Sequence, residues 1–131
     1  MKRRLLLTAA LLLTTLVNST YAQQQVGPSA LFGKWTATEQ HPSGATLTSL
    51  VQFTDDKQFT TSTTVNGKPF MKASGSWKLS GKTLEWKYEQ SSHPAIQRGF
   101  VDTDEIESVG ATELSLVSKQ SGKKHIYQRV Q

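Results

Sequence analysis

The sequence predicts an all-β fold, an antiparallel up-and-down barrel of about eight strands. Turn signals such as Asn66-Gly67 and Ser80-Gly81 recur at a steady interval after residue 31. The segments between them are rich in Thr, Val, Phe, Trp and Tyr, and none carries apolar residues at helical spacing. Short, evenly spaced strands with such turns are typical of a β-sandwich or an up-and-down barrel.

The two segments around Ser80-Gly81 favour the barrel. With these two residues as the turn, Trp77 would lie opposite Leu84, and Gly75 opposite Trp86, all on one face. Large residues then face small ones, as in the interior of a narrow barrel. The other face of the same hairpin is polar throughout. A barrel wall requires one apolar face toward the interior and one polar face toward solvent.

The neighbouring segments keep this alternation if their turns have odd length. A three-residue loop at Asn66-Gly67-Lys68 would point Phe59 and Val65 inward, whereas a two-residue loop would turn them to water. A three-residue loop at residues 55–57 would pair Phe53 with Phe59. In the sixth segment Asp102 and Asp104 share a face with Ile106, and the sequence leaves open whether that face is the inner one.

The start of the chain has the features of a secretory signal. Basic residues Lys2, Arg3 and Arg4 precede an apolar run and a small residue, Ala22. The run is shorter than the roughly 20 residues that cross a bilayer, so we expect no stable membrane anchor. The expected organisation is a signal peptide at 1–22, cleaved near Ala22, a flexible leader at 23–30 and a barrel domain at 31–131. The product would be periplasmic or secreted.

Charge and cysteine content exclude several classes of function. The formal net charge of +5 falls to +2 after cleavage, because the signal holds three cations and no acid. Nucleic-acid binding requires a clustered basic face, so we expect no such partner. The chain has no cysteine, which excludes thiol catalysis and cysteine-based zinc sites. Its length suits one domain, and we expect a monomer.

The first and last predicted strands carry a Trp and an Arg that could contact each other. Gly33-Lys34-Trp35 opens the first segment and Arg129 lies in the last, so antiparallel closure would lay the guanidinium on the Trp35 ring. The Gly-x-Trp opening and the terminal Arg resemble the lipocalins and other calycins, and the chain looks most like small lipocalin-like domains exported by bacteria. The resemblance implies a barrel with Trp35 and Arg129 as a structural pair at one end. The chain lacks the lipocalin Thr-Asp-x-Tyr motif, and we expect no lipocalin-type helix between the last strand and Gln131.

The predicted interior supplies a candidate ligand site. Small hydroxyl residues at mid-height would face two aromatic rings, with one cation near the mouth; the candidate ligand-binding residues are Ser49, Thr61, Thr63, Trp86, Tyr88 and Arg98. Such a lining indicates non-catalytic binding of a small, largely apolar molecule. The alternative left open is a barrel filled by its own rings. The protein would then be an interaction module, an inhibitor or envelope accessory factor, that contacts an envelope or extracellular protein through its loops.

The histidines, and the absence of known catalytic motifs, give little indication of metal binding or catalysis. His41, His93 and His125 are expected at the end opposite Trp35, but their spacing matches no known metal motif, so they are weak metal candidates at best. No motif of a hydrolase, a metalloprotease or a phosphate-binding loop is present. We therefore expect a protein that is not an enzyme and needs no cofactor.

Overall fold

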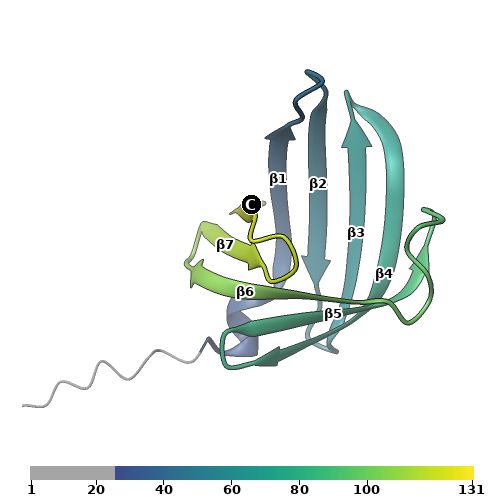
Figure 1. Ribbon diagram of the computed structural model, residues 1–131. Helices are drawn as coiled ribbons and strands as arrows, with labels where there is room; N and C mark the ends of the chain where they lie inside the picture. The colour runs from purple at the N-terminus through teal and green to yellow at the C-terminus, as the bar shows by residue number, and fades with distance from the viewer. Residues whose placement is uncertain (1–25) are drawn as a thin grey trace, which may run out of the picture.

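The computed structural model describes residues 26–131, which form eight antiparallel strands in up-and-down order that close into a barrel (Figure 1). The predicted fold class is therefore confirmed. The predicted signal peptide and its cleavage near Ala22 lie outside the described residues. Of the predicted leader, residues 26–30 are described, and a short 3-10 helix, η1, begins there. Within residues 26–131 no helix has the length and apolar character needed to cross a bilayer.

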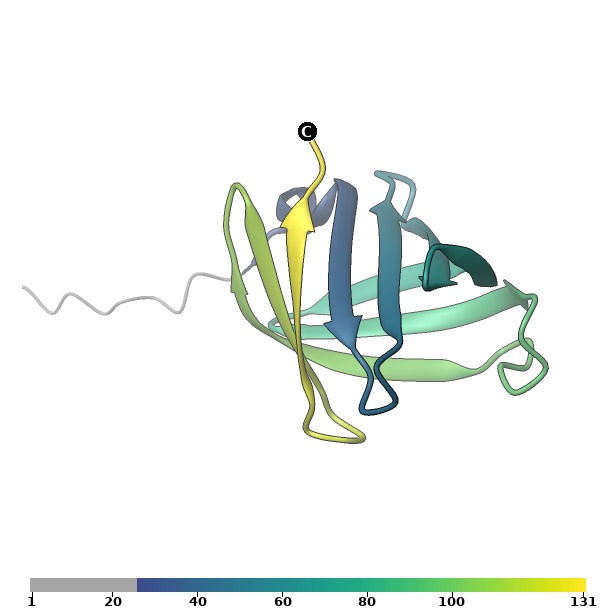
Figure 2. The same ribbon diagram turned by 90° about the horizontal axis from the view of Figure 1, so that it is seen from above.

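The elements follow one another with short connections. They are η1 (Pro28–Leu31), β1 (Gly33–Gln40), β2 (Thr46–Phe53), β3 (Gln58–Val65), β4 (Lys68–Ser80), β5 (Thr83–Ser91), β6 (Val101–Val109), β7 (Glu113–Ser118) and β8 (Lys124–Arg129). Figure 1 shows β1 to β4 side by side, with β5 and β6 crossing below them. Figure 2 shows β8 beside β1, where Trp35 pairs with Arg129 and closes the barrel.

The apolar core fills one end of the barrel, which we call the Trp35 end. Trp35, Phe53, Phe59 and Leu84 are almost completely buried there. The Phe53 ring lies 5.5 Å from the Trp77 ring in an edge-on arrangement, so the aromatic side chains interlock. The opposite end, which we call the far end, holds the β1–β2, β3–β4 and β7–β8 connections.

The long strand β4 pairs with β3 on one side and with β5 on the other, and it bends at Gly75. A β-bulge separates Ser74 from Gly75 in the ladder with β5. A Cβ atom on Gly75 would lie 1.9 Å from the Lys87 carbonyl oxygen, so only glycine allows β5 to approach this closely.

Two predicted three-residue loops can be compared with the strand pairing. The three-residue loop at 55–57 is present, with Thr54 bonded to Gln58 and Phe53 paired with Phe59. The predicted three-residue loop at Asn66-Gly67-Lys68 is wrong. Asn66 and Gly67 form a two-residue turn with positive φ at both positions, and a bulge after it restores the predicted facing of the strand.

Two hairpins are shifted by two residues from the predicted register. The β4–β5 turn is Gly81-Lys82, so Trp77 pairs with Trp86 and not with Leu84. In the β7–β8 hairpin, a turn at Ser121-Gly122 would place Tyr127 opposite Leu116, both facing in. In the structure Tyr127 pairs with Leu114 and His125 with Leu116. A shift of two residues leaves every side chain on its predicted face, so the inner and outer residues are those expected.

Candidate ligand cavity at the far end

Two adjoining cavities occupy the barrel interior toward the far end. The first, which we call the acidic cavity, has a volume of about 140 Å³ and is lined by residues of β2, β3, β5, β6, β7 and β8. The second, the rim cavity, has a volume of about 260 Å³ and lies among β1, β2, β3, β4 and β8. His125 and Tyr127 line both cavities, so the two spaces meet at β8.

The acidic cavity takes its name from Asp102 and Asp104. Their strand partners are Trp86 and Leu84, which face the interior, and the ladder therefore turns both carboxylates inward. The Trp86 indole N–H donates a hydrogen bond to Asp104 Oδ2 at 2.8 Å. Asp104 is only 8% exposed, and its burial, together with the neighbouring Asp102 charge, raises the pKa of its carboxyl group.

Two tyrosines form further walls of the acidic cavity. Burial, followed by the charges of Asp102 and Asp104, raises the pKa of Tyr88 to about 12. Burial also raises the pKa of Tyr127, with Asp104 and Glu39 adding to the effect. Both hydroxyls are therefore protonated at neutral pH, and each can donate or accept a hydrogen bond beside the carboxylates.

An ionic group from β1 and β8 borders the rim cavity. The Glu39 carboxylate pairs with the His125 imidazole, and Lys123 donates a hydrogen bond to its other oxygen at 3.2 Å. Partial burial acts to raise the Glu39 pKa, but the hydrogen bonds from His125 and Lys123 outweigh it and the pKa is lowered. The backbone pairing of β1 with β8 is confined to Trp35 and Thr36, so this group joins the two strands where their ladder has ended.

The structure brings five of the six predicted ligand-binding residues to these cavities. Ser49 and Thr63 line the rim cavity, with their hydroxyls 3.2 Å apart. Thr61, Trp86 and Tyr88 line the acidic cavity. Most of the Trp86 ring packs in the core against Phe53 and Phe59, and its N–H edge meets the cavity.

Arg98 does not join them. It lies in the β5–β6 connection, and its side chain is exposed, with Nε 3.7 Å from Glu89. The reason is the length of that connection, residues 92–100, which loops outward from the barrel wall (Figure 1).

The three histidines do not converge. His41 is exposed in the β1–β2 turn and bonds to Ser43, whereas His93 lies against the Phe70 ring. His125 is part of β8 and faces the interior beside Glu39. Within residues 26–131 no group of three His, Asp or Glu side chains is arranged to hold a metal ion.

The predicted barrel-end pair does meet. The Arg129 guanidinium lies 4.1 Å from the centroid of the Trp35 ring. It also donates hydrogen bonds to the carbonyl oxygens of Phe32, Ala30 and Ala111 at 2.7, 3.0 and 2.8 Å. The Trp35 indole N–H donates a hydrogen bond to the Leu31 carbonyl oxygen at 2.9 Å, which holds η1 against this end of the barrel.

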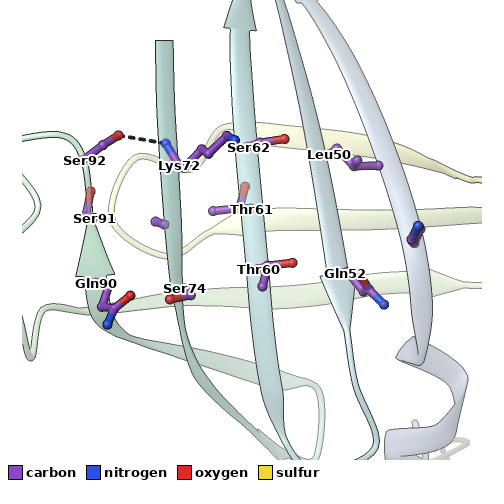
Figure 3. Close-up of a pocket in the computed structure, with 12 residues that line it drawn as sticks. Leu50, Gln52, Thr60, Thr61, Ser62, Lys72, Ser74, Gln90, Ser91 and Ser92 are labelled. Atoms are coloured by element: carbon purple, nitrogen blue, oxygen red, sulfur yellow. Dashed lines mark hydrogen bonds between the residues drawn. The ribbon is translucent and has the colours of Figure 1, made fainter. Parts of the chain in front are cut away.

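A separate groove of about 620 Å³ lies on the outer face of the sheet formed by β1 to β5 (Figure 3). Its walls carry hydroxyl and amide side chains such as Thr60 and Gln52, the lysines Lys34 and Lys72, and the exposed Leu50. None of the described residues that line this groove is a carboxylate. The chain therefore presents a polar, weakly basic outer hollow and an acidic inner one.

Glu39 and Tyr127 were not singled out from the sequence as site residues, although the signal was present. Glu39 follows Trp35 and Ala37 at alternate positions, so all three face inward. Tyr127 alternates in the same way with Arg129 and His125. For an inward Asp104 the sequence offers Arg98 or His125 as a partner. In the structure the hydrogen-bond donor is Trp86, the His125 charge favours the carboxylate, and Arg98 pairs with Glu89 instead.

These features define a small closed antiparallel β-barrel with one filled end and one hollow, acidic end. No protein-family model matches the sequence, and comparison with curated protein sequences finds no match.

Proposed function

We propose that this protein is a lipocalin-like barrel that binds a small molecule, without altering it chemically, in the acidic and rim cavities. The supporting observation is that the core fills only the Trp35 end, while adjoining cavities of about 140 and 260 Å³ remain in the other half. Ligand pockets usually measure about 300–1,000 Å³, so the two spaces together suit a compact ligand.

The lining indicates how such a ligand would lie. Leu47, Met71 and Ala37 give the rim cavity an apolar wall. Asp102, Asp104 and the tyrosine hydroxyls give the acidic cavity polar groups that fix orientation. The proposed ligand is therefore apolar over most of its surface, with one polar end directed toward β6.

A neutral dye with environment-sensitive fluorescence tests this proposal. The dye should bind the folded protein, and Thr61→Trp should abolish binding because the indole fills the acidic cavity. Thr60→Trp is the matched control, since Thr60 faces the outer groove on the same strand. Binding lost in Thr60→Trp and kept in Thr61→Trp would contradict an interior site.

A second candidate function, a protein-interaction module, is favoured by the outer groove in Figure 3. Lys34 and Lys72 there face no carboxylate in the groove, so an acidic strand or loop of an envelope or extracellular protein would complement them. The Thr60→Trp variant separates the two candidates, because it obstructs the groove and leaves the interior open.

The proposed role includes export. The expected signal at residues 1–22 would deliver a mature chain that begins at Gln23. N-terminal sequencing of the protein recovered from the culture medium or the periplasm should return Gln23-Gln24-Gln25. A chain that retains Met1 would overturn this part of the proposal.

A further inference from the structure

The acidic cavity has a charge imbalance that bears on the ligand it takes. Asp102 and Asp104 occupy alternate positions on β6 and both face the cavity. Asp104 accepts one hydrogen bond, from Trp86, which leaves its Oδ1 without a protein partner among residues 26–131. The only hydrogen bond to the Asp102 side chain in the described residues comes from the neighbouring Thr103 backbone N–H.

Among the described residues, one shared basic group, His125, faces these two carboxylates. Neither cavity is lined by a lysine or an arginine from the described chain. His125 lines both cavities and its charge favours the Asp104 carboxylate, but its direct ion pair is with Glu39. Lys123 pairs with Glu39, and Arg98, which lies away from the cavities, pairs with Glu89. The two inward carboxylates of β6 therefore share a single imidazole with Glu39 and have no counter-ion of their own among the described residues.

Buried carboxylates without a counter-ion destabilise a fold, because each loses its hydration. A chain that only needed a filled barrel would place apolar residues at 102 and 104, as it does at Ile106 on the same face. Retained acids facing an open space are instead typical of a site that receives a cation.

The neighbours of the carboxylates favour an organic cation over a metal ion. Calcium takes six to eight oxygen ligands and magnesium about six, and no group of three acidic or histidine side chains among the described residues is arranged to hold a metal ion. The other walls are the aromatic residues Trp86, Tyr88 and Tyr127. Aromatic rings and carboxylates together are the surroundings that a protonated amine prefers.

We infer that the ligand carries a protonated amine, which Asp102 and Asp104 bind in the acidic cavity while its apolar body extends into the rim cavity. The volume agrees, since a cavity of about 150 Å³ can hold a benzene-sized molecule and the acidic cavity has about 140 Å³. This inference rests on the proposed interior site and adds the chemical class of its ligand.

Calorimetric titration with three probes of nearly equal shape tests the inference. The probes are 2-phenylethylamine, its neutral counterpart 2-phenylethanol and the anionic phenylacetate. The amine should bind on the order of 10- to 100-fold more tightly than the alcohol at neutral pH, because a charge-assisted hydrogen bond replaces a neutral one. Phenylacetate should bind most weakly.

Variants then assign the effect to the two acids. Asp102→Asn and Asp104→Asn should each bring the affinity for the amine close to that for the alcohol, while binding of the alcohol is unchanged. Glu105→Gln is the matched control, since Glu105 is exposed on the same strand and lines neither cavity. Thermal melting of each variant verifies folding, and Asp102, which is less buried than Asp104, provides the second test if one variant is unstable.

The outcomes separate the two proposals. Equal affinity for the amine and the alcohol would overturn the inference and leave the interior site standing. Tight amine binding that both Asn variants retain would also overturn it, since the carboxylates would then not bind the amine. If neither the three probes nor the neutral dye binds, both the inference and the proposed function are wrong.

Discussion

At the scale of single residues, Arg129 joins more parts of the molecule than any other side chain at the Trp35 end. Its three guanidinium nitrogens bond to carbonyl oxygens of η1, of the residue after η1 and of the β6–β7 connection. The same group lies over the ring of Trp35, which is fully buried. A planar fork of donors is required for this arrangement, and the point charge of lysine cannot reproduce it.

We therefore predict that Arg129→Lys lowers the free energy of unfolding by about 2–4 kcal/mol, because two of three charge-assisted hydrogen bonds are lost. Urea unfolding followed by tryptophan fluorescence measures the change. Arg98→Lys is the control, since that exposed ion pair should contribute less than about 1 kcal/mol. Equal stabilities of the two variants would show that Arg129 is not a structural residue.

Asp104 leads to a prediction about pH. Its pKa in the folded protein lies above the ordinary value of 3.8, so the folded state holds this proton more tightly than the unfolded chain does. The contribution of Asp104 to stability is therefore favourable at low pH and is lost as the pH rises through the folded pKa.

Asp104→Asn, which resembles the protonated acid, should accordingly be more stable than the wild type at pH 7 and equal to it below pH 3.8. Thermal melting of both proteins across this pH range measures the difference. A variant that is less stable than the wild type at pH 7 would show that the Trp86 hydrogen bond outweighs the burial of the charge.

At the scale of elements, β4 determines how the barrel turns from one group of strands to the other. Gly75→Ala should destabilise the protein by about 3 kcal/mol or more, since its methyl group would overlap the Lys87 carbonyl oxygen. Gly110→Ala is the matched control, because the nearest atom to a Cβ there is 3.9 Å away and φ is not positive. Its effect should stay within about 0.5 kcal/mol in the same denaturant titration. A tolerated alanine at position 75 would contradict the close approach of β5.

The hairpins show how much of the fold the sequence predicts. Alternation of apolar and polar residues assigns Trp77, Trp86 and Tyr127 to the inner face, and this holds in the structure. Alternation is unaffected by a shift of two residues, so the pairing of Trp77 with Trp86 could not be derived from it. The position of the turn determines that pairing, since Gly81 has φ +60° and begins a two-residue turn with Lys82.

The interior site is harder to predict from the sequence than the fold is, for a physical reason. Small inward residues such as Ser49 and Thr63 indicate space, and they do line the rim cavity. Whether Asp102 and Asp104 face that space depends on the ladder between β5 and β6, which is five residue pairs long. An acidic strand on the outside of a barrel has the same composition, so composition alone favours the exposed alternative.

At the scale of the whole molecule, the two ends of the barrel have different roles. Trp35, Arg129 and η1 close one end with aromatic packing and charge-assisted hydrogen bonds. The far end keeps its space and lines it with acids and tyrosines. A stable, filled half can support a half that has uncompensated charge, which is the usual relation between a scaffold and its binding site.

The three tryptophan indole N–H groups provide a direct test of where a ligand binds. The Trp86 group bonds to Asp104 in the acidic cavity, whereas those of Trp35 and Trp77 bond to carbonyl oxygens of Leu31 and Gln58 at the filled end. In ¹⁵N-labelled protein titrated with 2-phenylethylamine, the Trp86 indole resonance should move strongly and saturate, and the other two should remain in place. Movement of the Trp35 or Trp77 resonance with a stationary Trp86 resonance would contradict a binding site at the far end of the barrel.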